Sequence, residues 1–515
     1  MSAQSTTRRP TGQLAALCAV LLGLTAIRLW LVKVPLIPDE AGFYQVAQTW
    51  TLHGPNLYGH YFVDRPPGLI ALFGLAALTG HIVAIRLVGL ACALVFVVLV
   101  WWVVRRTGGA VLPAVVVAAA LVGTPLNEAV YASGELFALP FVMGTVALLV
   151  LARDSRGLAS YLWMAGAGLA GIAAMSVKQN FVDGLLFAGV LLVARVVRRE
   201  LELRRALNLV APLVAGVLAG VVAMGALAAA TPAGLSGLWL AAVSFRSRAT
   251  TVILSDNTAG TRNRIVEVLL VMVVTGAVPM LLALAGRAFR DRLRGPAWAW
   301  AIGVTAVAEV LSAVGGGSYW PHYALQLAPM AVLGTGLVWR RALAVRIVAA
   351  LVVVSAVGSA VGFMVTRAHR PQDTSAIMGH WIRDASRPGD TAVVLYGHAE
   401  IQWATEMRSP YPFLWSLPTR TLDPHLGVLT SVVAGPHAPT WIMADNPVSS
   451  WNLDQSGAFR RALHRRYLSV GNVCGAQVWL RRQTPRQLTT PPRCDGLSVP
   501  PDWYLVKLGH WLTRP

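Results

Sequence analysis

The stretch IVAIRLVGLACALVFVVLVWWVVRR, residues Ile82 to Arg106, decides the fold class. Its apolar part is long enough to cross a lipid bilayer as one helix, which needs about 20 residues. It ends in the pair Arg105 and Arg106, and arginine directly after an apolar run is typical of the cytoplasmic end of a membrane helix. The stretch therefore predicts a transmembrane helix whose second end lies in the cytoplasm.

The composition of the whole chain extends this prediction. Of its 515 residues, 56% are hydrophobic and only 13% are charged, and the mean hydropathy is +0.59. These values exclude a soluble globular protein, so we predict a mainly α, polytopic membrane protein built as a helical bundle. The formal net charge of +20 comes largely from arginine clusters between apolar runs, where arginine sets topology. Nucleic acid is therefore not an expected partner.

The apolar runs and the arginine clusters together predict the topology. About eleven spans are expected, at 14–34, 82–104, 110–124, 135–152, 161–177, 181–197, 206–230, 264–286, 297–314, 322–338 and 343–365. Along this series, every second loop carries a cluster of arginines of the kind that marks the cytoplasmic side. This alternation agrees with a cytoplasmic N-terminus and an uncleaved first span. The apolar segment from Pro67 to Thr79 is too short for a crossing and suits an interfacial or re-entrant helix.

A change in composition near residue 370 predicts two domains, a transmembrane domain at 1–370 and a C-terminal domain at 371–515. An odd number of spans places the second domain outside the cytoplasm. Strands are predicted at 391–396, 440–444 and 477–480 and helices at 374–385 and 456–466, so this domain is expected to be a small α/β unit. It contains eight of the eighteen tryptophans, which suit either sugar stacking or core packing.

The four cysteines fall into two classes. Cys18 and Cys92 lie inside predicted spans, where they are expected to be ordinary small apolar residues. Cys474 and Cys494 lie in the domain that is expected on the oxidising side, so we predict a disulfide between them. Neither a CxxC motif nor a Cys/His array occurs in the sequence, which excludes a zinc ribbon.

Polar residues that suit catalysis gather in the loops of one side, the outer side. They are Asp39, Glu40, Tyr44, Asp64, Arg65, Asn127, Glu128, Glu135, Lys178, Gln179, Asn180, Arg246, Arg248, Arg262, Arg264, Tyr319, His322, Tyr323 and Gln326. Carboxylates at a membrane surface are costly and are by default functional candidates. A carboxylate can accept the proton of an attacking hydroxyl or amine, and cations can stabilise a departing phosphate.

Two simpler interpretations remain open for these residues. Asp39 and Glu40 follow Pro38 and suit the first turn of a short surface helix. The long cations of the outer loops, such as Lys178, Arg246 and Arg248, suit interfacial snorkelling. We nevertheless predict that Asp39, Glu40 and Asp64 form the catalytic set. The predicted ligands of a donor phosphate are Arg65, Lys178, Arg246, Arg248, His322 and Tyr323, with Arg262 and Arg264 as the next candidates.

The order of several motifs resembles the GT-C superfamily of integral membrane glycosyltransferases. The motifs are Arg28, the segment Pro38 to Tyr44, the segment Asp64 to Pro67 and Ile85 to Leu87, followed by Met175 to Asn180 and Tyr319 to Pro329. The pattern is similar above all to the branch of protein O-mannosyltransferases and lipid A aminoarabinose transferases. The resemblance covers residues 14–365 and rests on the order and sidedness of the motifs.

This resemblance implies roles for individual residues. Asp39 matches the first-loop aspartate that acts as general base or positions the acceptor, and Glu40 is its neighbour. Asp64 and Arg65 match an acidic residue and a donor-contacting basic residue, which are more often Glu and Lys. Compared with lysine, arginine keeps the positive charge but places it on a planar, forked group. Compared with glutamate, aspartate has a shorter side chain. A divalent metal is therefore an open question, for which Asp64 and His322 are the ligands to consider.

The expected function is transfer of a sugar from a polyprenyl-phosphate donor to a glycan, lipid or protein acceptor, with an Asp base and inversion at the sugar. The reaction is expected on the outer face of the cytoplasmic membrane. A transporter or lipid flippase is the alternative, although the chain lacks the paired half-sequences that inverted repeats would give. A structural membrane protein is a third class, but it would not need an ordered set of carboxylates on one side.

Overall fold

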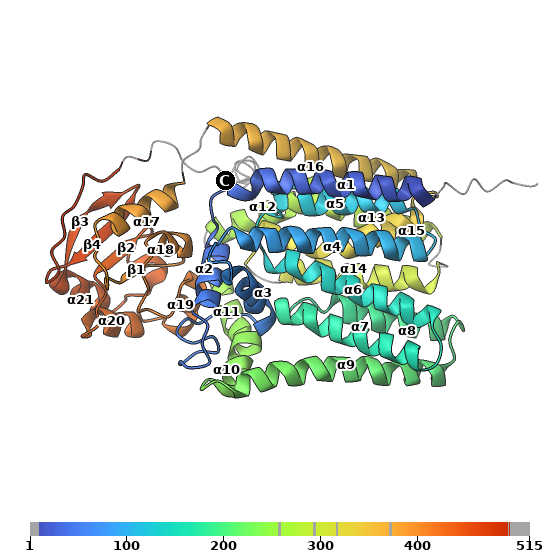
Figure 1. Cartoon of the computed structure of the whole chain (residues 1–515), viewed down its shortest axis with the longest axis horizontal. Helices are drawn as coiled ribbons and strands as arrows, with labels where there is room; N and C mark the ends of the chain where they lie inside the picture. The colour runs from blue at the N-terminus through green and yellow to red at the C-terminus, as the bar shows by residue number, and fades with distance from the viewer. Residues whose placement is uncertain are drawn as a thin grey trace, which may run out of the picture.

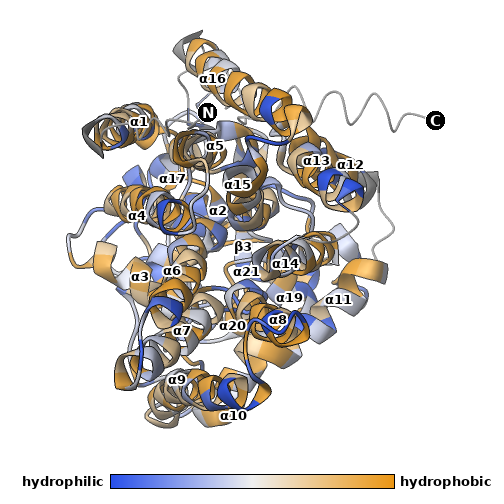
Figure 2. Cartoon of the chain, turned by 90° about the vertical axis from the view of Figure 1, so that its right-hand side faces the viewer, coloured by the Kyte–Doolittle hydropathy of each residue, from blue (hydrophilic) through white to orange (hydrophobic). Residues whose placement is uncertain are grey.

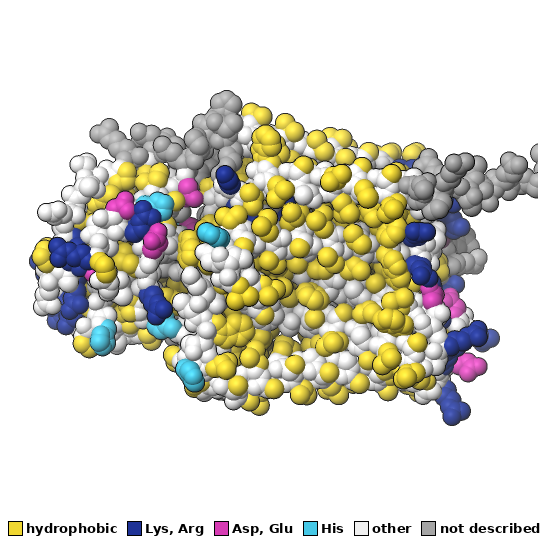
Figure 3. Space-filling model, in the orientation of Figure 1, with side chains coloured by type: hydrophobic (Ala, Val, Ile, Leu, Met, Phe, Trp, Pro, Cys, Tyr) yellow, Lys and Arg dark blue, Asp and Glu magenta, His cyan; other side chains and the backbone are white. Residues whose placement is uncertain are grey.

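The computed structural model of the chain describes residues 10–255, 259–291, 295–315, 318–369, 373–492 and 494. Its long helices form a bundle, and a smaller α/β part covers one end of that bundle (Figure 1). Hydrophobic side chains cover the face of the bundle seen in Figure 3, whereas charged side chains gather at its right-hand end and around the α/β part. The chain is thus a multi-pass membrane protein.

Seven helices of the described chain are long and apolar enough to cross a membrane, and an end-on view shows them packed side by side (Figure 2). They are α1 (Pro10–Trp30) extended by η1 (Leu31–Lys33), α4 (Ala84–Arg106), α6 (Gly134–Asp154), α7 (Leu158–Val177), α9 (Leu203–Ala229), α14 (Ala297–Gly315) and α16 (Leu343–His369). Each matches a predicted span.

The predicted span over 264–286 is not one straight helix. The structure divides it into α12 (Ala259–Val274) and α13 (Ala277–Arg290), which are bent by 60° relative to each other. Gly276 begins α13 with a φ of +78°, a conformation that glycine adopts without the strain of a side chain. The pair forms an eighth candidate span only if both helices are counted as one broken crossing.

Shorter helices match the remaining predicted spans. They are α5 (Val111–Gly123), α8 (Asp183–Val197) and the pair η4 (Pro321–Leu327) and α15 (Ala328–Val338). Helix α5 has 13 residues and α8 has 15, whereas η4 with 7 residues and α15 with 11 follow each other directly. A full crossing needs about 20 residues in one helix, so the number of eleven spans stays a prediction.

Five further helical segments lie at the end of the bundle that faces the α/β part (Figure 1). They are α2 (Pro38–Gln48), α3 (Pro67–Ala77), α10 (Gly234–Trp239), the π-helical turn η3 (Leu240–Ser244) and α11 (Phe245–Ser255). Helix α3 coincides with the short segment that the sequence predicts as an interfacial helix. The 3-10 turn η2 (Pro125–Asn127) follows α5.

The α/β part contains one described sheet with strand order β1-β2-β4-β3. Strands β1 (Ala392–Val394) and β2 (Trp441–Ala444) pair in parallel, whereas β4 (Ala476–Arg481) pairs antiparallel with β2 and with β3 (Tyr467–Val473). The helices are α17 (Thr374–Asp384), α18 (Ala399–Ala404), α19 (Ser416–Leu422), α20 (Gly427–Ala434), η5 (Ser450–Asn452) and α21 (Ala458–Arg466). The three predicted strands and both predicted helices are present, and β3 was missed.

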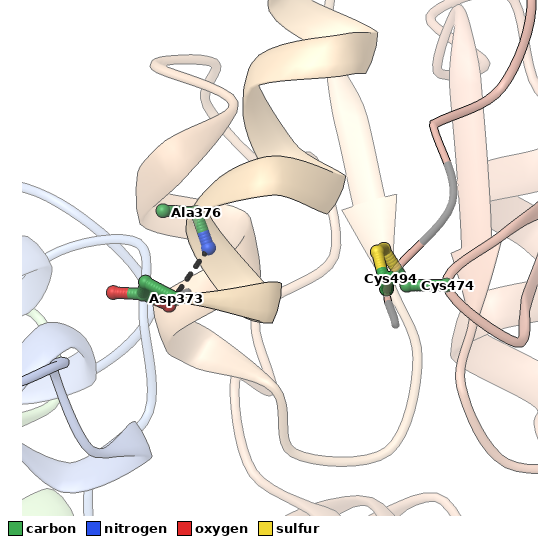
Figure 4. The surroundings of a disulfide bond; sticks show 4 residues. All are labelled: Asp373, Ala376, Cys474 and Cys494. Atoms are coloured by element: carbon green, nitrogen blue, oxygen red, sulfur yellow. Dashed lines mark hydrogen bonds between the residues drawn. A yellow bond between two sulfur atoms is a disulfide. The ribbon is translucent and has the colours of Figure 1, made fainter. Parts of the chain in front are cut away.

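A disulfide joins the end of this part to its sheet. Cys474 follows β3 directly and is bonded to Cys494, with their Cα atoms 5.1 Å apart (Figure 4). That separation lies within the usual range for disulfides. Figure 4 also shows the start of α17, where the Asp373 carboxylate accepts a hydrogen bond of 3.0 Å from the Ala376 N–H.

The α/β part is fixed to the bundle mainly through α2 and the loop that follows it. The Gln45 amide donates to the Ala399 carbonyl at 2.9 Å, and the Phe62 N–H donates to the Pro412 carbonyl at 3.1 Å. The Tyr44 ring packs edge-on against Trp403, with 5.1 Å between ring centroids. Helix α2 therefore lies between the bundle and the α/β part.

Candidate active site

The start of α2 is set by its own sequence. Pro38 occupies the first helical position, where its missing N–H costs nothing, and Ile37 before it is extended. Asp39 and Glu40 follow in the first turn, where negative charge is favourable beside the helix N-terminus. This short helix presents two adjacent carboxylates at the end of the bundle, but the structure gives them different surroundings.

Glu40 is fully buried and bound on both oxygens. Arg86 of α4 donates to Oε1 at 3.0 Å and to Oε2 at 2.6 Å, and the Ala132 N–H donates to Oε1 at 2.9 Å. Arg86 also donates to the carbonyls of Val32 and Val34 at 2.7 and 2.6 Å. Glu40 thus anchors α2 to α4 and to the chain after α1, which suits a residue that shapes the site better than one that exchanges protons.

Asp39 is only half-buried, and its partner comes from the α/β part. The Trp415 indole N–H donates to Asp39 Oδ1 at 2.9 Å. The same indole packs on Phe43 with 5.1 Å between ring centroids, and a Cβ on Gly42 would lie 2.2 Å from it. Glycine at position 42 is therefore what allows the indole to reach the carboxylate.

Asp64 lies between two arginines. Arg65 contacts one of its oxygens at 2.7 Å, and Arg246 of α11 contacts the other at 2.8 Å. Burial alone would raise the pKa of Asp64, but the charges of Arg246 and Arg65 outweigh it and lower that pKa below its usual value. Asp64 is consequently ionised at neutral pH, and it brings two predicted phosphate ligands together.

The loop of Asp64 and Arg65 is held from several sides. The Gln179 amide donates to the Asp64 carbonyl at 3.2 Å, and the Tyr58 hydroxyl donates to the Arg65 carbonyl at 2.6 Å. The Arg65 guanidinium lies over the Phe43 ring, 5.7 Å from its centroid, and it is within electrostatic reach of Asp39. The loop therefore connects the carboxylate of α2 to the arginine pair.

A second charged group surrounds His322 of η4. Lys178, directly after α7, forms an ion pair with Glu135 of α6, and its ammonium lies 4.3 Å from the Tyr323 ring centroid. His322 donates from Nδ1 to Glu128 at 2.5 Å, and its Nε2 lies 3.7 Å from Glu135. Burial alone would lower the pKa of His322, but Glu135 and Glu128 outweigh it and raise that pKa.

The remaining predicted cations are arranged differently. Arg248 is exposed, two residues beyond Arg246 on α11. Arg264 of α12 lies over the Trp320 ring at 5.4 Å from its centroid. The side chain of Arg262 is outside the described residues. The structure thus brings Arg65 and Arg246 together through Asp64, with Lys178 and Tyr323 in the adjoining charged group.

The predicted metal ligands have other partners. Asp64 is bound by arginines and His322 by glutamates. In the part of the chain that the structure describes, no group of three or more His, Cys, Asp or Glu side chains is arranged to hold a metal ion. The ligand pair that the sequence offered is thus not assembled into such a group.

Sequence reasoning missed Trp415 and did not assign Arg86 a role in the site. Trp415 is separated from Asp39 by 376 residues and is one of 18 tryptophans, so no local signal singles it out. Arg86 does carry a signal, because an arginine two residues into a membrane helix needs a buried partner. That argument would have paired it with Glu40 or with Asp39.

Comparison with known proteins shows a fold that the sequence comparisons do not detect. No family model matches the sequence, and no curated protein matches it either. Among solved structures, ArnT from Cupriavidus metallidurans bound to undecaprenyl phosphate aligns over 91% of this chain and 98% of its own, with a TM-score of 0.57 and 16% identity. The chain therefore has the same fold as this ArnT.

Two further solved structures match with lower TM-scores. The apo form of the same ArnT covers 92% of this chain and 98% of its own at 14% identity, with a TM-score of 0.46. The S. cerevisiae protein O-mannosyltransferase Pmt1-Pmt2 complex bound to the sugar donor covers 42% of this chain and 33% of its own at 17% identity, with a TM-score of 0.34. The first ArnT comparison, which covers 91% of the chain, agrees with the fold predicted from the motif order.

Proposed function

We propose that this protein transfers a sugar from a polyprenyl-phosphate donor to an acceptor outside the cytoplasm. The observation that carries the proposal is the pairing of a half-buried carboxylate, Asp39, with a neighbouring arginine pair, Arg65 and Arg246, at one end of a GT-C bundle. The ArnT structure with this fold contains undecaprenyl phosphate, a lipid of the proposed donor class.

The proposed reaction is an inverting displacement. The acceptor hydroxyl attacks the anomeric carbon of the donor sugar and loses its proton to Asp39 as the new C–O bond forms. The bond between that carbon and the phosphate oxygen breaks, and the phosphate leaves with the bonding electrons. Arg65, Arg246 and Lys178 stabilise the negative charge that develops on it. Trp415 binds only one oxygen of Asp39, so the other is free to take the proton.

The sidedness of the proposal follows from charge. The arginine-rich ends of α4, α6, α8 and α13 lie away from the α/β part (Figure 1), and such ends are cytoplasmic under the positive-inside rule. Asp39 and the α/β part are then extracytoplasmic, and the N-terminus is cytoplasmic. A disulfide in the α/β part agrees with an oxidising compartment.

The test uses the purified full chain in nanodiscs with radiolabelled polyprenyl-phosphate mannose and polyprenyl-phosphate arabinose as donors, and with a mixture of neutral oligosaccharides that supplies acceptor hydroxyls. The proposal predicts that free polyprenyl phosphate appears as label leaves the lipid fraction. A parallel assay in proteoliposomes measures movement of the intact donor across the bilayer. Movement with the sugar–phosphate bond intact, and with no cleavage of either donor, would support the flippase alternative and contradict the proposal.

A further inference from the structure

A polar cavity of about 630 Å³ lies between α2 and the α/β part. Its volume falls within the range of roughly 300–1,000 Å³ that is usual for small-molecule sites. One wall is formed by Gln45 and Gln48 of α2 and by Thr49 directly after it, and the opposite wall by residues of α17 and α18. None of its lining residues belongs to the predicted catalytic or phosphate-binding set.

The cavity and Asp39 lie on different sides of α2. Gln48 and Thr49 follow Gln45 by three and four residues, so they lie on the same side of the helix as Gln45. Asp39 precedes Gln45 by six residues, which corresponds to a rotation of about 240° around a helix with 3.6 residues per turn. A ligand in this cavity is thus held beside the reaction centre and not inside it.

Glu400 gives the cavity an unsatisfied acceptor. Its side chain lines the cavity and is only 7% exposed. One oxygen accepts from the Ser375 hydroxyl at 3.3 Å and from His398 Nδ1 at 3.2 Å, whereas Oε2 is buried with no hydrogen-bond partner. A buried carboxylate oxygen without a partner is costly, and a ligand donor would satisfy it.

The other residues that line the cavity indicate which class of ligand it would bind. Trp403 is half-buried, so part of its ring is open for an apolar face, and Gln48 is an exposed amide that can donate and accept. Among the described residues, the lining includes the carboxylates of Asp373, Glu400 and Glu406, one arginine, Arg408, and one histidine, His380. This excess of carboxylates disfavours an anionic ligand. Hydroxyl donors on a ring with an apolar face fit both properties.

We propose that this cavity binds a neutral saccharide unit of the acceptor, which makes the acceptor a glycan chain. That this saccharide belongs to the acceptor rests on the proposed function, but binding in the cavity does not depend on turnover. Glu400 Oε2 accepts a ligand hydroxyl, the Trp403 ring packs on the apolar face of the sugar, and the far end of the chain reaches Asp39 around α2.

The experiment measures binding by calorimetry with full-length Asp39→Asn protein in nanodiscs, without donor, so that failure of catalysis cannot affect it. The probes are maltotetraose, cellotetraose, α-1,6-mannotetraose and α-1,5-arabinotetraose, with tetragalacturonate as the anionic counterpart. We expect at least one neutral probe to bind. Adding Glu400→Gln should weaken that binding at least about tenfold, because a hydrogen bond to a carboxylate is among the stronger ones.

Two further variants serve as a control outside the cavity and as an independent change within it. Asp384→Asn makes the same chemical change at an exposed carboxylate outside the cavity lining and should leave binding unchanged. Gln48→Ala alters an exposed lining residue without touching the Glu400 network, and it should also weaken binding if Glu400→Gln unfolds the protein. Binding of no neutral probe, binding by the Glu400 and Gln48 variants as tight as that of the parent Asp39→Asn protein, or a preference for tetragalacturonate would overturn the proposal.

Discussion

At the scale of single residues, the two aspartates of the site differ in what holds them. Asp39 receives one neutral hydrogen bond from an indole, whereas Asp64 is held by two guanidinium groups. The first arrangement leaves a carboxylate oxygen for proton transfer, and the second fixes an anion that aligns two cations. The chemistry of a base is therefore expected at Asp39 and donor binding around Asp64.

Replacement of Arg65 tests donor binding. Arg65→Ala removes one of the two cations that Asp64 aligns, so kcat/KM for the polyprenyl-phosphate donor should fall by an amount equivalent to about 2–5 kcal/mol. Arg65→Lys retains the charge but not the planar fork and should lose less. Steady-state kinetics with varied donor measure both. Equal kinetics for Arg65→Ala and wild type would remove Arg65 from the donor site.

His322 predicts a pH dependence of stability. Its pKa is raised above the unfolded value of 6.5 by Glu135 and Glu128, which outweigh burial. A raised pKa gives stability that is fully present below pH 6.5 and is lost as pH rises through the folded pKa. The melting temperature should thus decrease as the pH rises above 6.5, and this decrease should be smaller in His322→Gln. An identical pH dependence in both proteins would contradict the assignment.

At the scale of elements, α2 is held at its two sides by contacts of different kinds. The Glu40–Arg86 pair ties it to α4, and Trp415 ties it to the α/β part. Local preferences in the sequence offered a short helix start at Pro38 as one of two interpretations of Asp39 and Glu40. The sequence did not predict these ties, because they join segments that are far apart in the chain and depend on packing of the whole molecule.

The Glu40–Arg86 pair predicts a large effect on stability. Glu40→Gln leaves the Arg86 charge buried without its counter-ion, so stability should fall by about 3–5 kcal/mol. Thermal unfolding in detergent measures the loss. The double variant Glu40→Gln/Arg86→Met should recover part of it, because the unpaired charge is gone. A Glu40→Gln protein as stable as wild type would show that the pair does not anchor α2.

Gly42 tests the contact between α2 and Trp415. In Gly42→Ala the added Cβ would lie 2.2 Å from the indole, so the indole must move and its hydrogen bond to Asp39 is lost. Transfer should fall about as far as in Trp415→Phe. Gly74→Ala on α3 is the matched control, since no atom lies within 4 Å of its added Cβ. Full activity in Gly42→Ala would contradict a role for this contact.

At the scale of the whole molecule, the sequence predicts the order of the elements better than the contacts between them. Apolar length and arginine position locate each span, because both follow from the cost of placing polar groups in a bilayer. The same reasoning cannot count crossings where α5, α8 and α15 are short, nor detect the bend at Gly276. The motif order indicated the GT-C fold, but the pairing of Asp64 with Arg246 depends on how α11 packs.

The central claim is that catalysis occurs at Asp39, at the end of the bundle beside the α/β part. The most direct measurement is transfer from a radiolabelled polyprenyl-phosphate sugar by wild-type, Asp39→Asn, Asp64→Asn and Asp154→Asn proteins. Asp154→Asn makes the same change far from the site. Asp154 is the last residue of α6, about 30 Å by helix length from Glu135, which lies at the site end of that helix. We predict a loss of roughly 100-fold to 10,000-fold in Asp39→Asn and none in Asp154→Asn. Unchanged transfer by Asp39→Asn would contradict the account, and a loss confined to Asp64→Asn would assign the base to Asp64.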